Sequence, residues 1–169
     1  MPTKTIQKIT PHLWYAREAE DAARFYASIF PDSKVDRVTA MPASSPSGPA
    51  GSVKIVDFTL FGQPFTAISA GPLDAFNHAI SFVVNCDDQA EVDRYWNALS
   101  KGGSTEQCGW LKDKFGVSWQ IVPTVLNEMI ADPDREKARR AAEAMLNMVK
   151  LDVAGLKAAY EGRAPKGSR

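Results

Sequence analysis

Two histidines and two cysteines are the side chains with the greatest reactive potential in this sequence. His12 and His78 both lie near predicted strands, and two histidines combined with carboxylates can hold iron, zinc or nickel. Neither has an evident partner nearby, which favours a structural position for each over a ligand role. We expect His12 to bury its ring against the first helix and His78 to lie at the surface near the start of a strand.

The cysteines could act as nucleophiles only with a base within hydrogen-bond reach. His78 is the one candidate base in the second half of the chain, which contains both Cys86 and Cys108. Because free cysteines usually pack as small hydrophobic side chains, we predict structural thiols. Asp113 and Lys114 fall between two predicted strands, and we expect a solvated turn there. No catalytic residue is assigned.

The composition excludes several classes of partner. The chain has 169 residues, 44% apolar and 24% charged, which is typical of a globular protein. Twenty basic residues balance twenty acidic ones, so no net field favours nucleic acid or an anionic membrane. No apolar run reaches the roughly 18–20 residues of a membrane-spanning helix, and the first eight residues lack the apolar stretch of a signal peptide. Two cysteines form no disulfide framework, which suits a reducing compartment. We therefore predict a cytoplasmic protein without nucleic-acid or membrane partners.

The elements that must position these residues occur in the same order twice. Apolar periodicity and turn residues predict strand, helix and three strands at 9–15, 18–30, 34–41, 53–60 and 65–69. The order repeats with a strand at 79–84, a helix capped by Asp88 and Glu91, and strands within 106–112 and 117–122. Phe25-Tyr26 and Tyr95-Trp96 lie 70 residues apart, and the same offset superposes the first strands.

This repeat predicts an α+β fold of two βαβββ modules followed by C-terminal helices. We expect a single domain over 1–161, with module one at 6–70, module two at 78–123 and a helical tail at 124–161. Residues 162–169 are expected to be disordered. Because neither module could bury its sheet face alone, the two should share a cavity or a core.

Three segments carry a resemblance to a known family. They are residues 9–14 (Ile-Thr-Pro-His-Leu-Trp), residues 25–31 (Phe-Tyr-x-x-Ile-Phe-Pro) and residues 108–123. They resemble the PhnB-like family, often named 3-demethylubiquinone-9 3-methyltransferase, of the vicinal oxygen chelate superfamily. The resemblance covers about residues 6–160. It implies paired βαβββ modules, each sheet curved round a cleft, and a homodimer.

The methyltransferase name is not supported by motifs. A Rossmann-type methyltransferase needs a glycine-rich turn between a strand and a helix. Here the first strand runs into residues 16–18, Ala-Arg-Glu, and the order of the predicted strands differs from that fold. We therefore consider methyl transfer unlikely.

The resemblance also implies positions for a metal ion. Superfamily enzymes bind a divalent metal through His, Gln or Glu on the first and last strands of each module. Counting back from Phe25 places the first-strand position on Pro11, and the repeat places its equivalent on Ser81, while Gln120 takes the last-strand position. Proline cannot ligate through its side chain, serine is a poor ligand, and the strand at 65–69 offers none. We expect no metal and no cofactor, unless a bulge brings His12 into the cleft.

Strand alternation predicts the concave, ligand-binding face. Its lining would be apolar and aromatic with a few neutral hydrogen-bonding groups, as in small-molecule pockets. Trp14, Trp96 and Trp119 are expected on the opposite, helix-facing side, while Trp110 could join the lining or pack beneath it. The predicted ligand-binding residues are Tyr15, Ser81, Trp110, Ser118 and Gln120.

Two functions remain open at this point. The first is metal-independent binding of a small apolar or aromatic ligand in the sheet cleft. The alternative is a metal-dependent enzyme of the glyoxalase or dioxygenase type with an atypical ligand set. Whether the chain is an enzyme is left undecided.

Overall fold

The computed structural model describes residues 7–163, which divide into two compact units with the boundary between Asp74 and Ala75. Most of the predicted disordered tail, from residue 164 on, lies outside the described residues. The prediction that residues 1–161 act as a single domain stays a prediction.

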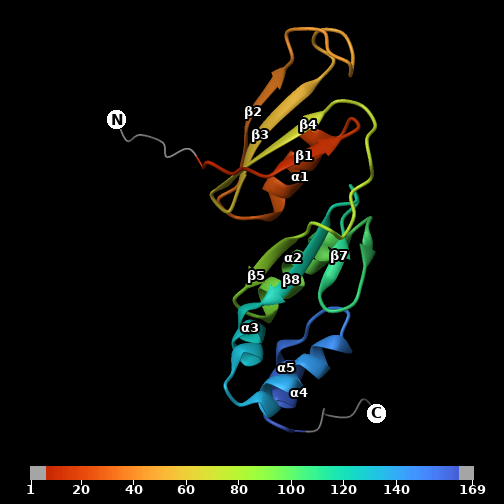
Figure 1. Cartoon of the computed structure of the whole chain (residues 1–169). Helices are drawn as coiled ribbons and strands as arrows, with labels where there is room; N and C mark the ends of the chain where they lie inside the picture. The colour runs from red at the N-terminus through yellow and green to blue at the C-terminus, as the bar shows by residue number, and fades with distance from the viewer. Residues whose placement is uncertain (1–6, 164–169) are drawn as a thin grey trace, which may run out of the picture. The chain divides into compact units, whose positions relative to one another are not determined.

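The first unit is a four-stranded sheet with one helix on one face (Figure 1). Its strands have the order β1-β4-β3-β2, with β1 parallel to β4 and the other pairs antiparallel. The helix buries Ala22, Ala23 and Tyr26. The elements are β1 (His12–Tyr15), α1 (Ala19–Ile29), β2 (Lys34–Ala40), β3 (Lys54–Leu60) and β4 (Gln63–Ser69).

The second unit repeats this topology. Its sheet has the order β5-β8-β7-β6, with β5 parallel to β8. The strands that follow Gly103 join the same sheet as β5, so the predicted repetition of a βαβββ module is confirmed, as is the α+β fold class. The elements are β5 (Phe82–Cys86), α2 (Gln89–Ser100), β6 (Ser104–Thr105), β7 (Trp110–Lys112) and β8 (Ser118–Pro123).

The start of α2 follows its sequence signal. Asp88 Oδ1 accepts a hydrogen bond from the amide of Glu91 at 2.9 Å. The Glu91 carboxylate reaches back to the amide of Asp87 at 3.0 Å, one residue earlier than in a standard capping box. The buried face of the helix packs against the sheet and consists of Val92, Tyr95, Trp96 and Leu99.

The first strand departs from the predicted repeat by one residue. Leu13 and Tyr15 are buried beneath α1, and the matching buried residues of β5 are Val84 and Cys86, an offset of 71 rather than 70. Three residues connect β1 to α1, whereas two connect β5 to α2. Because side chains alternate along a strand, this one extra residue reverses the faces of β1.

Two predictions fail for this reason. His12 does not pack against the first helix, because it is exposed on the face of the sheet that points away from α1. Trp14 is half-buried on that same face, and its Nε1 donates to the carbonyl of Gly71 at 2.9 Å. Trp96 and Trp119 are buried on the helix side, as predicted.

The helical tail follows β8, belongs to the second unit and contains three helices. These are α3 (Thr124–Ala131), α4 (Arg135–Leu146) and α5 (Val153–Tyr160). Asp152 caps α5, as its carboxylate accepts from the amides of Ala154 and Gly155. The helices enclose a small core of their own, made of Val122, Leu126, Met129, Ala141, Leu151 and Leu156.

Backbone hydrogen bonds join this tail to the sheet. The amide of Cys108 donates to the carbonyl of Met148 at 2.7 Å, and that of Gly109 donates to the carbonyl of Val149 at 2.8 Å. The side chain of Gln89, at the start of α2, accepts from the amide of Val153 at 2.7 Å. The tail therefore supports the chain immediately before β7.

Gly109 is the residue at this junction that tolerates change least. Its φ of +81° disfavours any side chain, and an added Cβ would lie 2.9 Å from the carbonyl oxygen of Ile121 and 3.0 Å from Leu151 Cδ1. We predict that Gly109→Ala lowers the free energy of unfolding by about 3 kcal/mol, because left-handed strain and a backbone clash add. Urea denaturation measures this loss.

Gly116→Ala provides the matched control. Gly116 has a similar φ of +87°, but nothing lies within 4 Å of its added Cβ. Gly116→Ala isolates the backbone strain and should lower the free energy of unfolding by about 1 kcal/mol. Equal losses in the two variants would contradict the close packing at Gly109.

Candidate functional site: the open face of the second sheet

The second sheet has one face covered by α2 and one that points away from it. Leu111, Trp119 and Ile121 are buried toward α2. Their strand neighbours alternate to the other side, where Trp110 is the cross-strand partner of Gln120. We call this side the open sheet face and define it by Ser81, Val83, Trp110, Lys112, Ser118 and Gln120.

Four of the five predicted ligand-binding residues lie together on this face. Gln120 Nε2 donates a hydrogen bond to Ser81 Oγ at 2.9 Å. Trp110 lies beside Gln120 on the neighbouring strand and is half-buried. Ser118 is two residues from Gln120 and almost fully buried, and among residues 7–163 its Oγ has no hydrogen-bond partner. That these residues bind a ligand stays a prediction.

Tyr15 does not take the predicted position. It is 4% exposed, and its hydroxyl lies 3.3 Å from the hydroxyl of Tyr26 in α1. The expectation that it lines an open face is wrong because the extra residue in the β1–α1 connection turns it under the helix. The unequal lengths of the two strand–helix connections become evident only when the fold fixes the ends of the strands and helices.

A histidine–glutamate pair borders the open sheet face. His78 Nε2 is hydrogen-bonded to the Glu106 carboxylate, and its ring centroid lies 5.8 Å from that of Trp110. His78 is at the surface, as predicted, and precedes β5 by several residues. Sequence reasoning missed its partner, since no local pattern relates positions 78 and 106.

Asp113 holds the β7–β8 turn from inside the unit. It is 3% exposed, which contradicts the expected solvated turn. Its carboxylate accepts from the amides of Phe115 at 2.8 Å and Val117 at 3.1 Å, and from Trp119 Nε1 at 2.8 Å. These bonds offset the cost of burying the charge and orient Trp119 toward α2. Gln120, the next residue, consequently points to the open sheet face.

The first sheet places a histidine where the sequence analysis expected a proline. His12 lies opposite Thr66 in a regular pairing of β1 with β4, so no bulge is needed to bring it to this face. The nearby carboxylate of Asp57 is engaged by Arg37 at 2.6 Å and by Thr66. The assignment of the first-strand position to Pro11 was therefore wrong.

The side-chain donor groups of the described residues do not form a site for a divalent metal ion. Between residues 7 and 163, no three His, Cys, Asp or Glu side chains gather closely enough to hold an ion. The open sheet face offers an amide and hydroxyls, which are weak ligands for transition metals. Neither unit by itself presents a ligand set for such a metal, and the expected absence of a metal stays a prediction.

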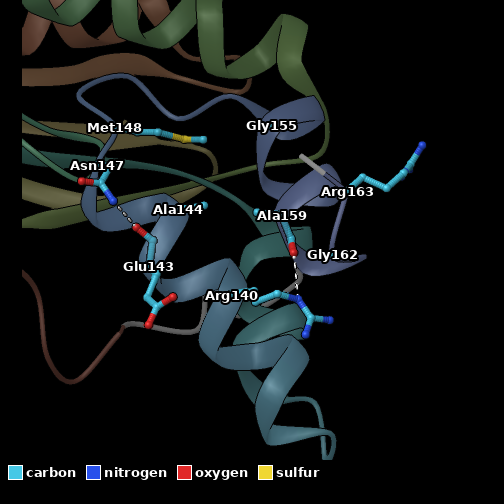
Figure 2. Close-up of a pocket in the computed structure, with 9 residues that line it drawn as sticks. All are labelled: Arg140, Glu143, Ala144, Asn147, Met148, Gly155, Ala159, Gly162 and Arg163. Atoms are coloured by element: carbon cyan, nitrogen blue, oxygen red, sulfur yellow. Dashed lines mark hydrogen bonds between the residues drawn. The ribbon is translucent and has the colours of Figure 1, made fainter. Parts of the chain in front are cut away.

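Two hollows lie elsewhere on the molecule. One of about 640 Å³ lies in the helical tail and contains no predicted site residue (Figure 2). There the Arg140 guanidinium donates to the carbonyls of Ala159 at 3.1 Å and Tyr160 at 2.8 Å, so it serves as a cap for α5. The other, of about 720 Å³, lies on the first sheet beside the ion pair of Arg37 with Asp57.

The thiol of Cys86 is fully buried beside α2, and burial raises its pKa to about 12. Because the thiolate is the reactive form, we predict that iodoacetamide at pH 8 alkylates Cys86 about a thousandfold more slowly than an ordinary thiol. Mass spectrometry of native protein should find the label on the partly buried Cys108. A Cys108→Ser variant should take up label only after denaturation. Rapid labelling of native Cys86 would contradict its burial.

Comparison with known proteins places this architecture in a family. The family model described as 3-demethylubiquinone-9 3-methyltransferase matches residues 7–122, which span both βαβββ modules. The chain belongs to this family. No curated protein matches the chain. The helical tail lies beyond the match.

Solved structures agree with the family. A PhnB protein from Bacillus cereus is 32% identical, covers 70% of this chain and 100% of its own, and has a TM-score of 0.63. A protein from Pseudomonas aeruginosa is 24% identical, with 70% and 98% covered and a TM-score of 0.53. The fosfomycin resistance protein FosX from Mesorhizobium loti is 16% identical, with 75% and 100% covered and a TM-score of 0.52. The last likeness shows a shared fold alone.

The family name refers to methyl transfer, but the fold of the described residues differs from that of a Rossmann-type methyltransferase. Each module combines one parallel strand pair with antiparallel pairs, and its strand–helix connection has no glycine. A Rossmann site instead needs a parallel sheet with a glycine-rich turn.

Within residues 7–163, no helix is long and apolar enough to span a bilayer.

Proposed function

We propose that the PhnB-like chain binds a small molecule with an apolar or aromatic group on the open sheet face, without a metal. The observation that carries this proposal is the half-buried Trp110 beside the hydrogen-bonded pair of Gln120 and Ser81. An indole ring offers a flat apolar surface for stacking, and the amide and hydroxyl can orient a polar group. Apolar surface with a few convergent polar groups is the usual composition of small-molecule sites.

The neutral fluorescent probe N-phenyl-1-naphthylamine tests this proposal. We expect saturable binding that Trp110→Ala weakens about tenfold, because the stacking surface is lost. Trp110→Phe should restore most of the affinity, which separates stacking from a folding defect. Leu146→Ala removes an exposed apolar side chain of α4 and is the matched control. EDTA should leave the affinity unchanged, and binding that is indifferent to Trp110→Ala would refute the site.

The alternative function is a metal-dependent enzyme of the glyoxalase or dioxygenase type. One observation favours it, namely that His12 lies on the face of the first sheet that points away from α1. Elemental analysis of protein purified without chelator decides between the two functions. About one metal ion per chain, lost in His12→Ala, would replace the binding proposal with the enzyme.

We also propose a homodimer in the cytoplasm. The second unit exposes several large apolar side chains, and such surface often marks an interface. Ile80 and Val149 are two of them. We predict that light scattering gives twice the chain mass of 18.5 kDa. A mass of one chain at all concentrations would contradict the dimer. The cytoplasmic location is supported by two free cysteines.

A further inference from the structure

Lys112 is a cation without a counter-charge on the open sheet face. It lies two residues beyond Trp110 on β7, and strand alternation places both side chains on the same side of the sheet. The lysine is half-buried, and its ammonium has no hydrogen bond or ion pair with any residue from 7 to 163. By contrast, Lys150 is held by Asp93 at 2.6 Å in the same unit.

Two carboxylates close to Lys112 in the sequence are already bound by other groups. Glu106, just before the hairpin turn into β7, is bound to His78. Asp113 follows Lys112 in the chain but points to the opposite face, where three donors satisfy it. The charge of Lys112 is therefore not balanced by these two neighbours.

A second polar group on this face also lacks a partner. Ser118 is the cross-strand partner of Lys112 and is 1% exposed. Its Oγ has no hydrogen-bond partner among the described residues, although buried polar groups in native proteins are nearly always bonded. Lys112 and Ser118 are direct neighbours across the strands, and the Cβ atoms of such a pair lie about 5 Å apart.

We propose that the molecule bound on the open sheet face is an organic anion, whose negative group lies between Lys112 and Ser118 while its apolar part stacks on Trp110. This inference rests on the proposed binding function and adds the charge of the ligand. An ammonium and a hydroxyl are both donors to a carboxylate, sulfonate or phosphate oxygen. Trp110 and Lys112 are two residues apart on β7, so their Cα atoms lie about 7 Å apart. A compact aromatic acid matches this separation.

Two probes that differ only in charge test the inference. 1-Anilino-8-naphthalenesulfonate has the same skeleton as N-phenyl-1-naphthylamine and adds one sulfonate. We expect the protein to bind the sulfonate about tenfold more tightly, as charge-assisted hydrogen bonds allow. Lys112→Gln should abolish this preference, so that the two probes bind with equal affinity. Ser118→Ala should weaken the sulfonate alone by about threefold.

Lys101→Gln is the matched control, since Lys101 is exposed at the end of α2 and away from this face. It should retain the full preference for the sulfonate. Equal affinities for the two probes in the wild type, or a preference that survives Lys112→Gln, would overturn the inference. Trp110-dependent binding of the neutral probe would then still support the proposed function. If neither probe binds in a Trp110-dependent way, the function and the inference fail together.

Discussion

The buried carboxylate of Asp113 is the constraint on which the second sheet depends. A charge this deeply buried is tolerated only because three N–H groups bind it, from Phe115, Val117 and Trp119. Those bonds set the β7–β8 turn and direct the Trp119 indole toward α2. Alternation then places Gln120 on the opposite side, beside Trp110. The open sheet face is thus a consequence of a bond network on the other side of the sheet.

The helical tail also supports the second sheet, although it lies beyond the residues that the family model matches. Its three helices bury a core that continues from Val122 at the end of β8. The stretch between α4 and α5 receives hydrogen bonds from the backbone just ahead of Trp110, and Gly109 permits the close approach. The tail therefore braces the strand that carries the aromatic and cationic groups of the open sheet face. None of the residues in the core of the tail belongs to the open sheet face.

The charge distribution distinguishes the two sheets. On the first, Arg37, Asp57 and Thr66 satisfy one another, and Asp36 accepts from Thr59. On the second, the polar groups are of two kinds. Ser81 and Gln120 are paired, whereas Lys112 and Ser118 are cross-strand partners whose side chains find no acceptor among residues 7–163. Such unfilled bonding capacity is costly in a folded protein, and a bound molecule would supply the missing acceptor.

The sequence by itself determined the module order, the caps at Asp88 and Asp152, and the apolar stripe of α2, because each depends on residues a few positions apart. It also placed Ser81, Ser118 and Gln120 on one face, since alternation within regular strands is local, but it left the face of Trp110 open. Only the tertiary structure decided the faces of β1. One extra residue in the β1–α1 connection places Tyr15 beneath the helix and His12 on the opposite face. The burial of Asp113 and the pairing of His78 with Glu106 likewise arise from hydrogen bonds across the fold, which no local pattern encodes.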